Sequence, residues 1–360
     1  CEILGHPKGS YDIVSPNNHC NMAQSTNDAF PTAIKVCAII KSKPLLDALQ
    51  RLVDELEKKA EEYSEILKMG RTHLQDAVPI TLGQEMGAYA SGIRRGIKRI
   101  KSAVEGAHVI NMGATAVGTG LNAEPNYIHD VAYELSEVVG EPFYTAENLI
   151  DATNNTDVFA DISSGLKVTA LVLIKMANDF RLMASGPRCG IGELKLPARQ
   201  PGSSIMPGKV NPVIAEVLNQ VCYQVIGNDT TITLAVENGQ FELNVMEPVL
   251  AYNLFNNLCY LKNGVNTFVD KLLVDLEVDR DQCEYWLNRS VGIVTALLPH
   301  LGYETASALA KEAYETGRAI RDIILDQGLL TEDEINHILS PKEMTRPGIA
   351  GAKLLKQKGN

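Results

Sequence analysis

The sequence is dominated by long segments in which apolar residues recur at intervals of three and four. Between positions 49 and 67 the apolar positions are Leu49, Leu52, Val53, Leu56, Ala60, Tyr63 and Leu67, with charged residues in the intervals. This spacing places the apolar side chains on one face of an amphipathic helix. The same periodicity recurs over residues 83–110, 163–183, 212–237 and 243–269, with glycine-containing breaks at 113–120 and 185–187. Few stretches alternate with a period of two, so the pattern predicts an all-α fold, an elongated antiparallel helical bundle.

The periodicity changes after Pro299, where shorter helical segments begin. A helix is predicted from about Thr305 to Gln327, ending at Gly328. Thr331 and Glu334 have the spacing of a capping box, which predicts the start of a further short helix. We therefore expect two domains, a central helical bundle of residues 1–299 and a small C-terminal helical domain of residues 300–360.

Composition limits the classes of protein to which the chain can belong. Its 360 residues carry a formal net charge of -11. No basic run gathers charge for a nucleic-acid backbone, and no apolar stretch approaches the roughly 20 residues of a membrane-spanning helix. The 7 cysteines are scattered and lack Cys-x-x-Cys spacing, which indicates free thiols in a reducing cytoplasm rather than metal ligands. We expect a cytoplasmic protein without a metal site and without nucleic-acid or membrane partners.

Residues 200–212 combine hydroxyl groups with residues that favour irregular backbone. Ser203 and Ser204 lie between Gly202 and Gly208, which allow conformations that other residues avoid. The segment predicts a flexible loop that presents two hydroxyls. Glycine and serine alone would indicate no more than a surface linker.

Lys209, Asn211 and Pro212 follow these serines. Asparagine before proline is a helix-start signal, so a helix is predicted from Pro212 with Asn211 as its cap. A cationic side chain beside the free N–H groups of a helix N-terminus attracts a carboxylate. The alternative is that Lys209 is a solvated surface charge.

Two further segments carry more polar groups than a helical bundle needs. Ser25, Thr26 and Asn27 precede a helical segment, where any of them would serve as a cap, but with the following aspartate they exceed what one cap uses. Thr72 and His73 interrupt two predicted helices. A lone histidine is more often a structural residue than a catalytic one.

Together these segments resemble the signatures of the fumarase/aspartase superfamily, whose members eliminate a group from succinyl-type substrates and usually leave fumarate. The similar segments are residues 24–28, 70–79, 118–122, 200–212, 241–248 and 346–351. The resemblance thus covers nearly the whole chain. The family's first motif, of the type Gly-Thr-Ser-x-Asn-Met-Asn, would precede Cys1, so we expect an N-terminally truncated sequence.

Two details distinguish branches of this superfamily. Fumarases typically have Phe or Tyr and then Lys before the proline of residues 241–248, whereas Met246 and Glu247 are similar to the aspartase branch. Gln-Ser-Thr-Asn in residues 24–27, in place of Gln-Ser-Ser-Asn, indicates the same branch.

The resemblance implies two groups of site residues. The catalytic group is Ser203, His73 and Glu216. The substrate-binding group is Ser25, Thr26, Asn27, Thr72, His73, Ser204, Lys209 and Asn211. Ser203 would be the base, and Glu216 would raise the basicity of His73 and fix its tautomer. The alternative for Glu216 is a favourable charge in the first turn of a helix.

The implied reaction is the reversible elimination of ammonia from L-aspartate to give fumarate through an aci-carboxylate intermediate. It requires no cofactor. The family resemblance also implies a homotetramer whose active sites draw motifs from three subunits. Fumarate hydratase, acting on malate, is the alternative enzyme. A non-catalytic structural homologue, or an inactive fragment, is the alternative outside catalysis.

Overall fold

The computed structural model describes residues 1–358 and is mostly helical, as the periodicity predicts. The long helices are α1 (Thr26–Glu62), α2 (Leu82–Glu105), α5 (Asp157–Met183), α6 (Val213–Glu237) and α7 (Glu247–Phe268). Helices α6 and α7 lie in the predicted segments, and α5 covers its segment but begins earlier, at Asp157. Helix α2 ends at Glu105, before the predicted 110, because residues 109–110 form a strand. The segment from 49 to 67 differs at its end, because α1 stops at Glu62 and Leu67 begins a strand.

Shorter elements complete the described part of the chain. The helices are α3 (Pro125–Val139), α4 (Leu149–Asn154), α8 (Arg280–Arg289), α9 (Val294–Leu301), α10 (Tyr303–Thr316), α11 (Ile320–Asp326), α12 (Glu332–Ile338), α13 (Pro341–Met344) and α14 (Ala352–Lys358). The strands are β1 (Leu67–Thr72), β2 (Gln75–Thr81), β3 (Val109–Ile110), β4 (Tyr144–Thr145), β5 (Leu194–Lys195) and β6 (Glu277–Val278). Among residues 1–358, no helix is both long and apolar enough to cross a membrane.

The chain divides into two compact units. The first unit comprises Cys1–Gln50, Ile93–Lys175 and Val217–Asn266, and the second comprises Arg51–Gly92, Met176–Glu216 and Thr267–Asn360. Each of the five long helices contributes residues to both units. The domain boundary expected between residues 299 and 300 stays a prediction.

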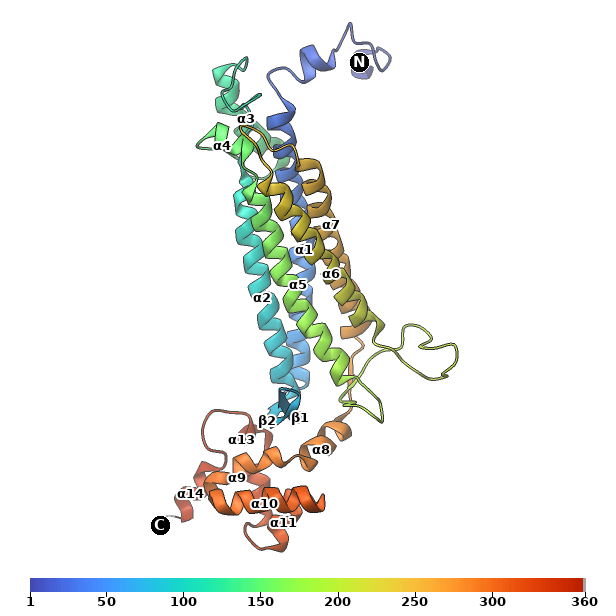
Figure 1. The fold of residues 1–360 in the computed structure, drawn as a ribbon, viewed down its shortest axis with the longest axis vertical. Helices are drawn as coiled ribbons and strands as arrows, with labels where there is room; N and C mark the ends of the chain where they lie inside the picture. Colours follow the sequence, from blue (N-terminus) through green and yellow to red (C-terminus); the bar gives the residue numbers. More distant parts are fainter. Residues whose placement is uncertain (359–360) are drawn as a thin grey trace. The chain divides into compact units, whose positions relative to one another are not determined.

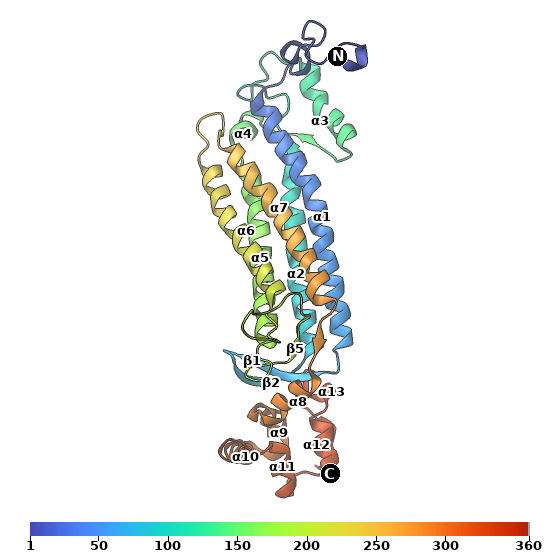
Figure 2. The ribbon, with the colours of Figure 1, turned by 90° about the vertical axis from the view of Figure 1, so that its right-hand side faces the viewer.

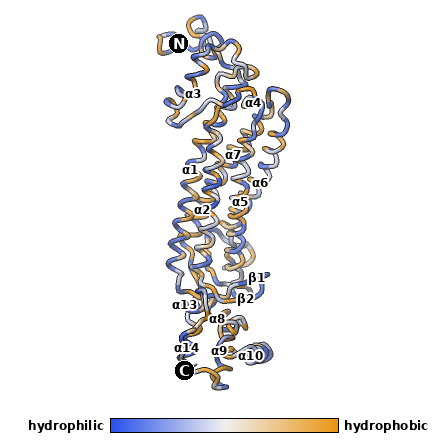
Figure 3. The backbone as a smooth tube through the Cα atoms, turned by 90° about the vertical axis from the view of Figure 1, so that its left-hand side faces the viewer, coloured by the Kyte–Doolittle hydropathy of each residue, from blue (hydrophilic) through white to orange (hydrophobic). Residues whose placement is uncertain are grey.

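The first unit is built from segments of the five long helices, which lie side by side (Figures 1 and 2). Apolar and polar residues alternate along these helices, as Figure 3 shows. The apolar positions form the core, and Leu45, Phe159, Leu166 and Leu254 are fully buried there. The amphipathic stripe therefore explains both the helices and their packing.

The second unit contains a β-hairpin between α1 and α2. Strands β1 and β2 pair in antiparallel register from Leu67 opposite Thr81 to Thr72 opposite Gln75. The register shifts between Met69 and Arg71, which is a β-bulge. A Cβ on Gly70, at this bulge, would lie 2.6 Å from the Val78 carbonyl oxygen, so glycine is required there.

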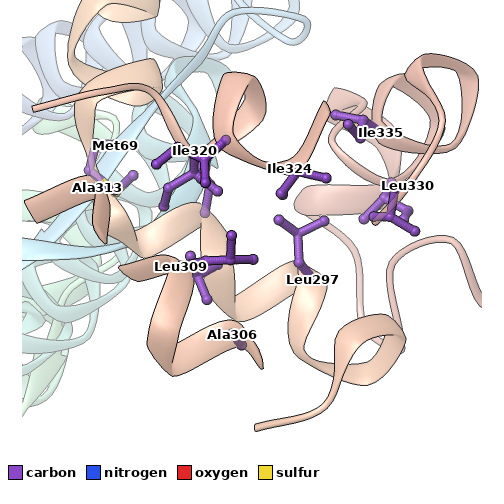
Figure 4. Close-up of a cluster of buried hydrophobic side chains, with 13 residues drawn as sticks. Met69, Leu297, Ala306, Leu309, Ala313, Ile320, Ile324, Leu330 and Ile335 are labelled. Atoms are coloured by element: carbon purple, nitrogen blue, oxygen red, sulfur yellow. The ribbon is translucent and has the colours of Figure 1, made fainter. Parts of the chain in front are cut away.

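A buried apolar cluster joins the hairpin to the C-terminal helices of the second unit (Figure 4). Met69 of β1 belongs to the same cluster as Leu297, Leu309, Ile320 and Ile335. The hairpin is therefore anchored at its base by side chains that the C-terminal helices supply.

Two predictions for the C-terminal helices have different outcomes. The capping box is confirmed, since the Thr331 side chain accepts from Glu334 N–H and the Glu334 side chain accepts from Thr331 N–H at the start of α12. The single helix from Thr305 to Gln327 is wrong, because α10 ends at Thr316, with Gly317 as its C-cap, and α11 follows. Gly317 has φ +70°, a left-handed conformation that ends a helix.

Candidate active site

The serine-containing segment is a loop of the second unit that connects β5 to α6 (Figure 2). Its two ends meet at Gly202, where an added Cβ would lie 1.8 Å from the Lys209 carbonyl oxygen. The Asn211 side-chain amide donates a hydrogen bond to the Gly202 carbonyl oxygen, with a length of 2.8 Å. Residues 203–208 thus form a ring of chain closed by one contact and one hydrogen bond. We call residues 202–211 the serine loop.

Within the serine loop, the Ser203 hydroxyl oxygen is contacted by two backbone N–H groups. Its Oγ accepts hydrogen bonds from the backbone N–H groups of Ile205 and Met206, both at 3.2 Å. Two N–H donors favour negative charge on the oxygen that they contact. Ser203 is half-buried, whereas Ser204 and Lys209 are exposed.

The start of α6 differs from the prediction. The helix begins at Val213, and the Pro212 carbonyl accepts its first hydrogen bond from Glu216 N–H at 3.1 Å. Pro212 rather than Asn211 therefore occupies the cap position, and the Asn211 amide closes the serine loop. The side chain of Glu216 lies 4.0 Å from that of Arg181, at the end of α5.

Thr72 and His73 lie at the tip of the β1–β2 hairpin. His73 and Leu74 form the turn, with φ values of 53° and 60°. Non-glycine residues seldom adopt these left-handed conformations, and such strain is concentrated at functional sites. Both Thr72 and His73 are exposed. Among the described residues, His73 has no hydrogen bond or ion pair with Glu216 or with the serine loop.

Ser25 belongs to the first unit and caps α1. Its Oγ accepts from Asn27 N–H at 3.1 Å, and its own N–H donates to Asp28 Oδ1 at 2.9 Å. The capping interpretation is therefore confirmed for Ser25. The hydroxyl proton of Ser25 is still available to an incoming carboxylate, and Thr26 is exposed beside it.

The residues that follow Ser25 form hydrogen bonds with the loop after β3. Asp28 is fully buried, and its Oδ2 accepts from the N–H groups of Gly113 and Thr115. The Asn27 amide donates to the Ala116 carbonyl oxygen at 2.7 Å. Asp28 was not among the predicted site residues. The signal that points to it is the length of the polar run, which exceeds what a cap requires.

The candidate residues are thus distributed over both units. Ser25, Thr26 and Asn27 belong to the first, whereas Thr72, His73, the serine loop and Glu216 belong to the second. Among residues 1–358, no group of three or more His, Cys, Asp and Glu side chains lies close enough together to hold a metal ion.

A family model described as "Lyase" matches residues 2–227, and one described as "Fumarase C C-terminus" matches residues 293–346. The chain belongs to the fumarase/aspartase superfamily of lyases.

Relatives with curated names and solved structures agree with this assignment. Aspartate ammonia-lyase of Bacillus subtilis is 52% identical over 99% of this chain and 75% of that protein. The Helicobacter pylori enzyme of the same name is 46% identical, over 96% of this chain and 74% of its own length. A structure of fumarate lyase:delta crystallin from Brucella melitensis bound to cobalt has a TM-score of 0.93 at 41% identity, covering 96% of this chain and 75% of that one. A class II fumarase from Schistosoma mansoni has a TM-score of 0.86 at 36% identity, with coverages of 92% and 73%.

Proposed function

We propose that this protein is a carbon-nitrogen lyase that eliminates ammonia from L-aspartate to give fumarate, and catalyses the reverse addition. The relatives named aspartate ammonia-lyase support this substrate. The observation that carries the chemistry is the pair of N–H groups on Ser203 Oγ, because they make a serine alkoxide less unfavourable.

The reaction begins with removal of a proton from Cβ of the substrate. This proton is weakly acidic because it lies beside a carboxylate that is already charged. Ser203, as alkoxide, takes the proton, and the electron pair moves into the carboxylate to give an aci-carboxylate with two negative charges. The Cα–N bond then breaks, the double bond forms, and ammonia leaves.

Preorganised donors must stabilise the charge that develops. Ser25, Thr26, Ser204 and backbone N–H groups of the serine loop are the proposed donors to the aci-carboxylate. Lys209 would bind the other carboxylate, and its exposed position leaves its charge available to a ligand. Asn211 would assist with the N–H that it does not donate to Gly202.

The remaining candidate residues are proposed to bind the leaving amino group and the α-carboxylate, or to orient a residue that does. His73 and Asn27 would contact the amino group, and Thr72 would contact the α-carboxylate. We propose that Glu216 orients His73 in the assembled enzyme. Its side chain, 38% exposed and 4.0 Å from Arg181, is accessible for such a contact.

We further propose that the enzyme is a homotetramer with shared active sites. Exposed apolar side chains on α6 and α7 of the first unit support this, because burying them against other subunits is favourable. They are Tyr223, Leu234, Val249, Tyr252 and Tyr260. Light scattering after size-exclusion chromatography measures the assembly directly.

The cysteines, all free, agree with the expected reducing cytoplasm.

Parallel assays test the substrate. The protein is incubated with L-aspartate and with L-malate, and fumarate is followed by its ultraviolet absorbance. We expect fumarate from aspartate, with ammonia released in equal amount. Fumarate from malate alone would replace the proposal by fumarate hydratase, which the similarity to class II fumarase makes the second candidate.

A further inference from the structure

Four charged residues form a buried cluster in the second unit, which we call the Glu193 cluster: Glu193, Lys68, Arg71 and Glu85. Glu193 is fully buried and Lys68 is 3% exposed. Lys68 Nζ lies 3.0 Å from both Glu193 Oε2 and Glu85 Oε2. Arg71 Nη1 lies 2.8 Å from Glu193 Oε1. The cluster contains two positive and two negative groups, so its charges balance.

Lys68 and Arg71 lie three positions apart on β1, yet both reach the Glu193 carboxylate. Residues separated by three positions on a regular strand point to opposite faces of the sheet. The hairpin is irregular between them, because two residues of β2, Ala77 and Val78, lie opposite Gly70 of β1. A bulge increases the local twist of the strands. This twist and the length of the lysine and arginine side chains bring both cations to one carboxylate.

The cluster connects two segments that carry candidate site residues. Lys68 and Arg71 lie on β1, and the next residues after Arg71 are Thr72 and His73 at the hairpin tip. Glu193 directly precedes β5, from which the chain continues into the serine loop. The Glu193 carbonyl oxygen also accepts from Asp279 N–H at 3.0 Å, which fixes the backbone of this segment.

Burial makes the arrangement sensitive to the loss of one partner. Burial alone lowers the pKa of Lys68, but Glu85 and Glu193 raise it by more, so the lysine stays charged. Removing the Glu193 charge would leave the partly buried Arg71 without its carboxylate and the buried Lys68 with Glu85 alone. The hairpin and the segment before the serine loop would then lose their common contact.

We propose that Glu193, Lys68 and Arg71 are positioning residues of the active site, which hold the His73 hairpin tip and the stem of the serine loop in one fixed arrangement. The catalytic part of this inference rests on the proposed function. The mechanical part, a common anchor for the two segments, does not.

Glu193→Gln tests the inference because it removes the charge with little change in shape. Glu61→Gln, on an exposed residue of α1 in the same unit, is the matched control. We expect kcat for L-aspartate to fall by about 10- to 100-fold in Glu193→Gln, with KM changed less than about threefold, because small displacements of catalytic groups are costly. The control should match the parent in both constants.

A second variant separates positioning from stability alone. Glu193→Gln combined with Arg71→Met removes the cation that loses its carboxylate in the single variant, while Lys68 keeps Glu85, so thermal stability should recover toward the parent's. The kcat should stay low, because the link between β1 and Glu193 is still lost. Recovery of kcat together with stability would reduce the cluster to a structural role and overturn the inference.

Hydrogen exchange measured by mass spectrometry gives a readout that needs no turnover. In Glu193→Gln, amides of residues 67–81 and 196–212 should exchange faster together, whereas those of α6 should not change. Unchanged exchange in both segments would overturn the inference whatever the activity. If the parent does not act on aspartate but the two segments respond together, the proposed function fails and the common anchor stands.

Discussion

The buried carboxylate of Asp28 accepts a hydrogen bond from the backbone N–H of Thr115, 87 positions later in the chain, at a distance of 3.0 Å. The same carboxylate also binds the N–H groups of Gly113 and Ser25. One side chain therefore fixes both the N-terminus of α1 and the loop that follows β3. The position of Ser25 therefore depends on the Asp28 carboxylate.

Asp28→Asn should destabilise the protein. An amide in place of the carboxylate loses the charge-assisted bonds and turns an NH2 group toward N–H donors, which costs about 2–4 kcal/mol. Chemical denaturation measures this loss. Asp161→Asn, at an exposed position of α5, is the control and should change stability by less than about 0.5 kcal/mol. Equal midpoints for the two variants would contradict the role of Asp28.

Ser203→Ala should abolish turnover while substrate binding largely survives. The substitution removes the oxygen that the N–H groups of Ile205 and Met206 contact, and with it the proposed base. Turnover is followed by fumarate absorbance, and binding by calorimetry with L-aspartate. Retained turnover would remove Ser203 from its role.

Gly202→Ala should lower kcat at least about tenfold with little effect on the melting temperature. The new Cβ would lie 1.8 Å from the Lys209 carbonyl oxygen, so the ends of the serine loop must separate. Because the loop is exposed, the helical core should remain intact. Gly87→Ala on α2, in the same unit, is the matched control, since its Cβ would meet only the Ala60 Cβ, at 3.9 Å. That variant should keep its activity and gain up to about 1 kcal/mol of helix stability.

The pH dependence of stability should reflect Glu247 and Lys35, two buried residues of the first unit. Burial raises the pKa of Glu247 from 4.5 to about 7, against the charge of Lys35. Burial likewise lowers the pKa of Lys35 from 10.5 to about 8, against Asp157 and Glu247. Between pH 4.5 and 7 the unfolded chain loses the Glu247 proton first, so stability falls as pH rises. Between pH 8 and 10.5 the folded chain loses the Lys35 proton before the unfolded chain does, so stability rises again with pH.

Glu247→Gln should remove the fall between pH 5 and 7. Relative to the parent, this variant should gain about 1–3 kcal/mol across that interval. Denaturation midpoints at several pH values provide the measurement. Glu237→Gln, at the exposed end of α6, serves as the control and should keep the slope of the parent. A parent whose stability does not change over this interval would contradict the assignment.

The helices could be predicted from the sequence because their apolar stripes are a local property. Helices α5, α6 and α7 therefore lie in the expected segments. The hairpin was not predicted, because β1 is buried irregularly and its pairing depends on Met69 packing against distant helices. The break at Gly317 had a visible signal in the glycine, but its φ of +70° comes only from the fold.

The candidate site could be predicted as a set of motifs but not as a set of contacts. The sequence indicates that Ser203 and Lys209 share a loop, since they are close in the chain. It does not indicate that Asn211 turns back to Gly202, because this depends on where the loop ends meet. The partners of Glu193 likewise come from segments more than 100 positions away.

The close approach of Gly202 and Lys209 confines residues 203–208 to a short tip that is closed at one place. Within this tip Ser203 and Ser204 carry the proposed chemistry, whereas Ile205 and Met206 offer Ser203 only their backbone N–H groups and leave their side chains exposed. Directed evolution of new amine or hydroxy-acid substrates can therefore vary these two side chains as a replaceable cassette while both serines and the scaffold stay constant.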